Sequence, residues 1–190
     1  MAKSFFNYGV PDFLKPVINK PVGNSVTYTD LMALLAERYL PRVNYLEIGV
    51  SVGKNFFQLL NTLGPASMNA FDIEEINPVL AGQLEKGPRS EWDTPASSIK
   101  KNKSSLSEFT YKDKKIGYIS ADVWDRNSWG RMEGKKFNLV FSDALHTPQA
   151  ILFEFEMLVK YGLLDQKFII IWDDSRGQNA EIFLPHHQEI

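Results

Sequence analysis

Short runs of apolar residues alternate along the chain with segments of helical periodicity, and this alternation limits the possible folds more than any other feature of the sequence. The predicted strands are residues 43–49, 67–73, 116–122, 136–144 and 166–174. The predicted helices are residues 27–40, 53–64, 125–132 and 147–162. Short strands that are apolar throughout and alternate with helices are typical of a parallel sheet with helices on both faces. The sequence therefore predicts an α/β fold with a doubly wound, mainly parallel sheet in three α/β/α layers.

The first predicted helix carries an apolar stripe. The residues that recur on it at helical spacing are Leu31, Leu34, Leu35 and Tyr39. We expect this stripe to face the core, because the apolar side of a surface helix is the side that packs. Thr27 or Thr29 is expected to cap the start of the helix.

One domain accounts for the whole chain. The chain has 190 residues, of which 44% are apolar, and this suits a single core. Residues 1–26 are rich in Pro, Gly and Asn and are expected to form an irregular arm. Periodicity is lost over residues 80–115, so we expect a surface insertion there, with one short helix from Pro95. Residues 175–190 would form a short C-terminal tail.

The overall charge gives no support for a polyanion partner or for electrostatic attachment to a membrane. The 21 basic and 23 acidic residues nearly cancel, so neither a nucleic acid nor a membrane is expected as a partner. No apolar run approaches the roughly 20 residues that span a bilayer, and the chain starts without a secretory signal. The absence of cysteine fits a reducing compartment, so we expect a cytoplasmic protein. Any metal site must use oxygen and imidazole ligands.

Acidic residues follow or end every predicted strand. They are Glu47, Asp72, Asp122, Asp143, Asp173 and Asp174. The carboxyl ends of parallel strands meet at one edge of the sheet, where α/β proteins bind their ligands. Any one of these acids, taken alone, is more often a turn or helix-cap residue. Five strands in succession that end this way predict an acidic cleft.

The turn after the first strand, "LEIGVSVG" (residues 46–53), has glycines at positions 49 and 53 and an acid at position 47. A dinucleotide site needs G-x-G-x-x-G and a helix start that approaches a pyrophosphate, which Glu47 would repel. The acids suit a ligand that carries adenosine and a positive charge. Asp72 can accept from ribose hydroxyls, Asp122 from the adenine amino group, and Glu47 favours an ammonium or sulfonium. S-adenosylmethionine has all of these parts.

"LEIGVSVG", "FDI" (residues 71–73), "SAD" (120–122) and "FNLVFSDALH" (137–146) resemble the successive motifs of class I S-adenosylmethionine-dependent methyltransferases, over about residues 40–175. The resemblance implies a Rossmann-like fold. It also implies that Glu47, Gly49, Ser51 and Gly53 line the methionine side, that Asp72 holds the ribose and that Asp122 holds the adenine. The predicted cofactor-binding set is Glu47, Gly49, Ser51, Gly53, Asp72, Ile73, Asp122 and Asp143.

"SDALH" and "WDDSRG" resemble a narrower group, the metal-dependent O-methyltransferases of the catechol and macrocin types. That resemblance implies a Mg²⁺ site made of Asp143, Asp173 and Asp174. Mg²⁺ prefers oxygen ligands, and a hydroxyl bound to it is more acidic. Alternatively, Asp143 contacts only the cofactor and Asp174 caps a loop. His146 is a candidate base for a small-molecule acceptor, with Asp143 beside it as a second candidate catalytic residue; His146 could equally belong to the shell of the metal or lead into the next helix.

The chain departs from the family at its C-terminal end. The family sheet continues with a helix and two antiparallel strands, whereas 16 residues follow Asp174 here, so we expect these strands to be missing or truncated. A homodimer could cover the edge left open. Two other functions stay open: a non-catalytic module, or truncated methyltransferase domain, that binds S-adenosylmethionine, and an NAD-dependent oxidoreductase, against which Glu47 and the missing middle glycine count.

Overall fold

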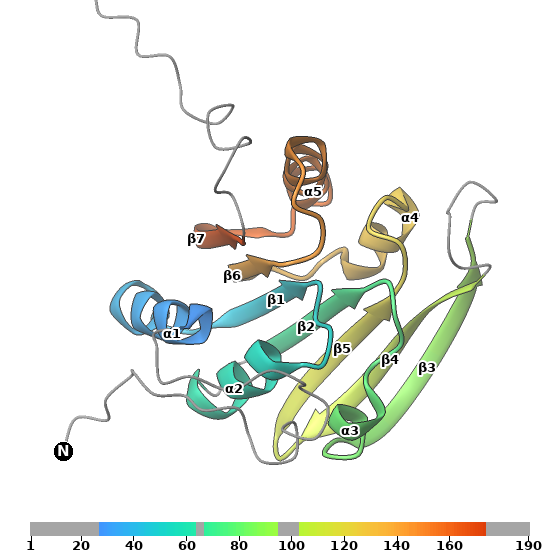
Figure 1. Ribbon diagram of the computed structural model, residues 1–190, viewed down its shortest axis with the longest axis horizontal. Helices are drawn as coiled ribbons and strands as arrows, with labels where there is room; N and C mark the ends of the chain where they lie inside the picture. Colours follow the sequence, from blue (N-terminus) through green and yellow to red (C-terminus); the bar gives the residue numbers. More distant parts are fainter. Residues whose placement is uncertain (1–26, 64–66, 95–102, 174–190) are drawn as a thin grey trace, which may run out of the picture.

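The computed structural model describes residues 27–63, 67–94 and 103–173, and these form one seven-stranded mixed sheet with helices on both faces (Figure 1). The strands are β1 (Asn44–Ile48), β2 (Ser67–Asp72), β3 (Glu85–Asp93), β4 (Lys103–Tyr111), β5 (Lys114–Ser120), β6 (Phe137–Ser142) and β7 (Leu164–Trp172). The helices are α1 (Tyr28–Tyr39), α2 (Lys54–Leu63), α3 (Pro78–Ala81), α4 (Arg126–Trp129), the 3₁₀ turn η2 (Gly130–Met132) and α5 (Pro148–Lys160).

The strands lie in the order β3-β4-β5-β2-β1-β6-β7. β5, β2, β1, β6 and β7 are parallel to one another, which confirms the predicted, mainly parallel sheet, with strand ends that lie within two residues of those expected. The chain runs from β1 outward to β2 and β5 and then resumes at β6, on the other side of β1. This reversal creates a switch point between β1 and β6, and the arrangement is consistent with a Rossmann-like fold.

Two hydrophobic cores hold the three layers together, one on each face of the sheet. On one face, Met32 of α1 and Phe56 of α2 pack with Tyr45 of β1. On the other face, Trp129 of α4 and Met157 of α5 are fully buried in a second cluster. Successive strand residues point to opposite faces, so the central strands contribute to both cores. This explains why β1 and β6 are buried along nearly their whole length.

Helix α1 begins as predicted but buries a different side. Thr27 caps it, and the Asp30 carboxylate accepts from the Thr27 backbone N–H in a capping box. The predicted core stripe is wrong, because its leucines at 31 and 34 are exposed. The residues of α1 that are fully buried apolar are Met32, Ala33 and Ala36. The small side chains of Ala33 and Ala36 let the helix pack closely against α2, to which Thr29 also bonds, and hydrophobicity alone does not reveal this.

Residues 80–115 are not the irregular insertion that the sequence suggested. β3 and β4 pair antiparallel with each other, and β4 pairs antiparallel with β5, so this segment continues the sheet. The pattern was hidden because β3 is almost wholly exposed and β4 buries serines, Ser104, Ser105 and Ser107, where a typical strand would carry apolar residues. The helix expected from Pro95 lies outside the described residues, as do the predicted arm at 1–26 and the tail at 175–190.

The antiparallel strands of the described sheet therefore lie beyond β5, at the edge opposite β7. β7 is the last strand at its own edge among the residues that the structure describes. The expectation of missing C-terminal strands concerns residues 174–190, which lie outside that part of the chain.

Candidate functional site

The turn between β1 and α2 places backbone directly against the end of β6. Gly49 has φ +81°, and a Cβ atom built on it would lie 2.6 Å from the carbonyl carbon of Asp143. Only glycine fits there without a shift in the backbone. Ser51 has φ +52°, a conformation that costs a non-glycine residue roughly 1–2 kcal/mol. Left-handed residues of this kind are concentrated at functional sites.

Asp72, the last residue of β2, fixes this turn in place. Its Oδ2 accepts from the backbone N–H of Val50 at 2.6 Å and of Ser51 at 2.9 Å. Its Oδ1 accepts from the N–H of Glu74 at 2.9 Å. A carboxylate has about four acceptor positions, so three are used within the protein. Asp72 therefore organises the glycine turn as well as facing the predicted ribose position.

Glu47 is buried in the middle of the site. It is 2% exposed, and the Tyr45 hydroxyl donates to its Oε2 at 2.7 Å. Burial raises the pKa of Glu47 to about 8; the bond from Tyr45 opposes this, and the charges of Asp143 and Asp72 add to it. The carboxyl group is therefore mostly protonated at neutral pH. A cation placed beside it would favour its ionised form.

Two pockets open at this edge of the sheet. The smaller, of about 390 Å³, is lined by Asp72, Ile73 and Asp122. The larger, of about 820 Å³, is lined by Glu47, by Lys54 of α2 and by Tyr28 of α1. The residues that line both pockets are Gly49, Ser51 and Asp143. The pockets therefore meet at the switch point between β1 and β6.

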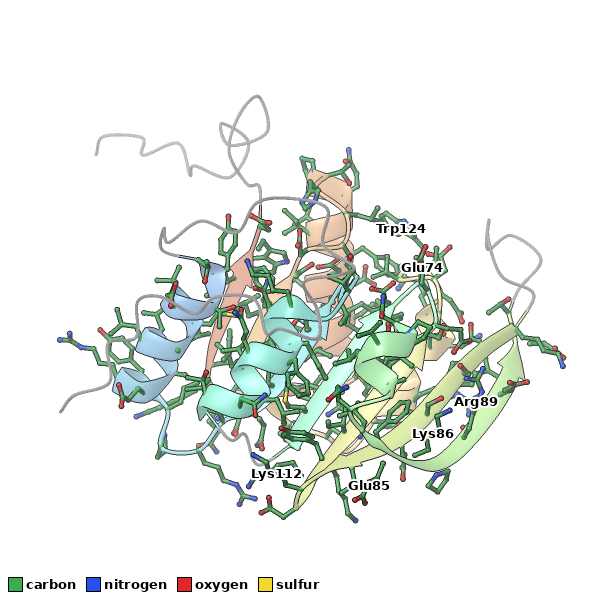
Figure 2. All side chains as sticks on the ribbon, turned by 60° about the horizontal axis from the view of Figure 1, so that its bottom comes forward. Glu74, Glu85, Lys86, Arg89, Lys112 and Trp124 are labelled. Atoms are coloured by element: carbon green, nitrogen blue, oxygen red, sulfur yellow. The ribbon has the colours of Figure 1, made fainter. Side chains whose placement is uncertain are left out.

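Most of the predicted cofactor-binding residues come together in these two pockets. The exception is Gly53, which lines neither: its φ of +80° favours glycine, and a Cβ atom there would lie 2.4 Å from Leu80 Cδ2. Asp122 lines the smaller pocket, and its Oδ1 accepts from the N–H of Trp124 at 3.0 Å, which forms a turn. The turn-residue interpretation is therefore confirmed for Asp122, and its role as a ligand of the adenine stays a prediction. The Trp124 and Glu74 side chains lie at this end of the sheet, opposite Lys112 and Glu85 (Figure 2).

Asp143 and Asp173 follow neighbouring strands. The Asp143 N–H donates to Ile48 O at 2.8 Å, and the Asp173 N–H donates to Ser142 O at 2.9 Å. The hydrogen bonding between neighbouring strands therefore continues as far as each of these acids. The His146 Nε2 lies 3.6 Å from Asp143 Oδ1, and both side chains are 40% exposed. The predicted catalytic pair, His146 and Asp143, is thus brought together, and of the two Asp143 lines both pockets.

The predicted metal site is described only in part, because Asp174 lies outside the described residues. Over residues 27–63, 67–94 and 103–173, no group of three or more acidic or histidine side chains is arranged to hold a metal ion. Asp143 and Asp173 supply two oxygen donors at adjacent strand ends. The magnesium site stays a prediction.

A comparison with models of known protein families found no match to this chain, and a comparison with curated proteins found none either. Within the described part of the chain, every helix is too short or too polar to cross a membrane. The function is therefore argued from the site itself.

One acidic residue near this site was not predicted from the sequence. Glu154 of α5 is buried, and its Oε2 accepts from Trp172 Nε1 at 3.3 Å. Its Oε1 has no hydrogen-bond partner among the described residues. Burial raises the pKa of Glu154 to about 7, against the effect of bonds from Ser142 and Trp172. The sequence did contain a signal for Glu154: at helical spacing it falls on the same side of α5 as the buried residues 150, 157 and 158, so an acid lies on the apolar side of the helix.

Proposed function

We propose that this chain binds S-adenosylmethionine in the two joined pockets and transfers its methyl group to a hydroxyl of a small molecule. One observation carries the proposal: the pockets share Gly49, Ser51 and Asp143 at the switch point of a parallel sheet. This is where α/β sheets bind ligands that contain a nucleoside.

The residues of the smaller pocket fit the nucleoside part of the cofactor. Asp122 has acceptor capacity beyond its turn bond, which suits the adenine amino group. Asp72 keeps about one free acceptor position, which is enough for one ribose hydroxyl but not for two strong bonds. Ile73 lines the same pocket and supplies apolar contact.

The larger pocket fits the charged part. The bound cofactor supplies a methyl group on a positively charged sulfur, which makes that methyl group open to displacement by an oxygen nucleophile. Glu47 can balance positive charge there by losing its proton, because its neutral form is favoured by burial and by the negative charges of Asp143 and Asp72, which a cation would offset. Lys54, at the start of α2, lines the same pocket and suits a carboxylate.

His146 and Asp143 would act on the acceptor. The 3.6 Å separation lets Asp143 orient the imidazole, so that His146 can take the proton of the hydroxyl group. Asp143, Asp173 and Asp174 would hold Mg²⁺, which lowers the pKa of a bound hydroxyl. The acceptor itself is not specified by these residues.

The test is titration calorimetry with S-adenosylhomocysteine and NAD, on the wild-type chain and on Asp72→Asn. The substitution weakens the acceptors that hold residues 50 and 51, so the affinity for S-adenosylhomocysteine should fall about tenfold or more. Asp165→Asn is the matched control, because Asp165 lies on β7 away from both pockets. Equal affinity of Asp72→Asn and wild type, or binding of NAD in preference, would argue against the proposal.

A further inference from the structure

A separate pocket lies at the other end of the sheet. It has a volume of about 450 Å³, and the first residues of β1 and β2, Asn44 and Ser67, line it. Parallel strands start at this end, so the pocket is a full strand length from the acidic cleft. In Figure 2, Lys112 and Glu85 mark the end of the sheet at which the parallel strands start, opposite Glu74 and Trp124.

A glycine within β5 and an irregularity between β3 and β4 border this pocket. Gly117 of β5 pairs with Asn69 of β2, and a Cβ atom on it would lie 2.5 Å from Asn69 Oδ1 and 3.3 Å from Lys135 Nζ. The β3–β4 register shifts between Lys86 and Arg89, so Gly87 lies at a bulge on the pocket wall. A glycine within a strand often marks the close approach of a ligand or of other groups, and bulges often occur beside functional sites.

Lys135 reaches into the space that Gly117 leaves. Its Nζ donates to Asn69 Oδ1 at 2.6 Å, and this partner is neutral. Desolvation lowers the pKa of Lys135, and the charge of Glu108 opposes this only in part. An ammonium group that is partly buried against a neutral amide is compensated only in part, here by the charge of Glu108. It has two further N–H donors.

The charges around Lys135 favour an anion. The titratable residues that line the pocket are Lys115, Lys135, Lys136 and Glu108. Three positive charges face one negative charge, so an incoming anion would meet a net attraction. Lys136 donates to Gly162 O and lies at the rim, which leaves Lys135 and Lys115 as the direct donors.

We propose that this pocket is a second binding site, for a small oxyanion such as a phosphate or carboxylate group, with Lys135 as its principal donor. An oxyanion seated there would accept a charge-assisted hydrogen bond from Lys135, and such bonds are about twice as strong as neutral ones. The site is independent of the proposed methyl transfer, because it shares no lining residue with either pocket of the acidic cleft.

The experiment titrates inorganic phosphate, and in a parallel series acetate, into the full chain at constant ionic strength. Wild type should bind phosphate saturably in the millimolar range or tighter, and Lys135→Met should weaken binding about tenfold or more. Lys167→Met is the matched control, since Lys167 is an exposed lysine on β7 at the far edge of the sheet, and it should bind as wild type does. Tighter binding of phosphate than of acetate would identify a phosphate-bearing ligand, and the reverse a carboxylate-bearing one.

A second readout does not depend on the affinity alone. An amine-acylating reagent should label Lys135 in the free chain, and phosphate should protect Lys135 but not Lys167 when each site is quantified by mass spectrometry. Thermal unfolding of Lys135→Met would show that the variant is folded. Phosphate binding that is unchanged in Lys135→Met, no saturable binding by wild type, or equal loss in Lys167→Met would each overturn the proposal.

Discussion

Replacing Glu47 by glutamine should remove a large pH dependence from the stability of the chain. Glu47 is buried beside Tyr45, and burial raises its pKa from 4.5 to about 8. Glutamine has nearly the same shape and keeps an oxygen that can accept from the Tyr45 hydroxyl. The variant therefore changes the titration of this position while leaving its packing almost intact.

The direction in which stability changes with pH follows from the direction of the Glu47 pKa shift. Below pH 4.5 the Glu47 carboxyl group is protonated in both the folded and the unfolded chain, so its titration does not lower the free energy of unfolding. Between pH 4.5 and 8 the unfolded chain loses this proton and the folded chain keeps it, so folding becomes less favourable as pH rises. Each pKa unit corresponds to about 1.4 kcal/mol. The loss should reach about 3 kcal/mol at pH 7 and level off above pH 8.

Urea unfolding of wild type and Glu47→Gln between pH 5 and pH 9 measures this effect. The difference in unfolding free energy between the two proteins cancels the other titrating groups. It should grow in favour of Glu47→Gln by about 2–3 kcal/mol from pH 5 to pH 7. A difference that does not change with pH would show that Glu47 is ionised in the folded protein and would refute the account of its burial.

Three further predictions concern other residues. Gly49→Ala should lose about 2 kcal/mol or more of stability, because the added Cβ atom would lie 2.6 Å from the Asp143 backbone. Gly134→Ala is the control: Gly134 has φ +83° and open space around it, so this variant should lose only about 1 kcal/mol. Equal losses in thermal unfolding would contradict the close approach at Gly49. Glu154→Gln should gain stability over wild type as pH rises from 4.5 to 7 and no further above that, since burial raises the Glu154 pKa to about 7; a flat difference in urea unfolding would show an ionised Glu154. Asp173→Ala should lose Mg²⁺-dependent methyl transfer while it still binds S-adenosylhomocysteine, with Asp165→Ala as the control; full activity of Asp173→Ala would remove the metal proposal.

The parallel part of the fold was predictable because its signals are local. Each of the five parallel strands is a short apolar run, and the helices between them carry ordinary caps, such as Thr147 before α5. The acids at the strand ends could also be placed at one edge, because parallel strands share a direction. This edge follows from the sequence without any knowledge of side-chain contacts.

The β3–β4 hairpin could not be predicted in this way. Its strands lie along one lateral edge of the sheet. β3 is exposed to solvent and β4 buries serine side chains, so neither strand shows a regular alternation of apolar and polar residues. Pairing with β5 over residues 105–111 stabilises β4. The two-residue turn between them, Lys112 and Asp113, lacks the Asn-Gly or Asp-Gly pair that signals a hairpin in a sequence. The buried side of α1 was predicted wrongly because it depends on how the helix packs against α2.

The individual roles of the site residues also depended on three-dimensional contacts. The sequence placed Asp72 and Glu47 at the cleft, but not the two backbone N–H groups that bind Asp72 Oδ2 or the Tyr45 hydroxyl that binds Glu47. Gly53 has the spacing of a ligand-binding glycine, yet it packs against Leu80. Motif spacing identified the region, and the contacts distinguish residues that face the pockets from residues that shape them.

The most direct test of the central claim is calorimetric titration of S-adenosylmethionine into the wild-type chain at pH 7, in two buffers of different ionisation enthalpy. The account predicts saturable binding with release of a proton, because the positive sulfur of the ligand favours ionised Glu47, whose pKa is about 8 in the free chain. Glu47→Gln should bind without that proton release. Absence of binding by the wild-type chain, or binding with no difference between the two buffers, would contradict the account of this cleft.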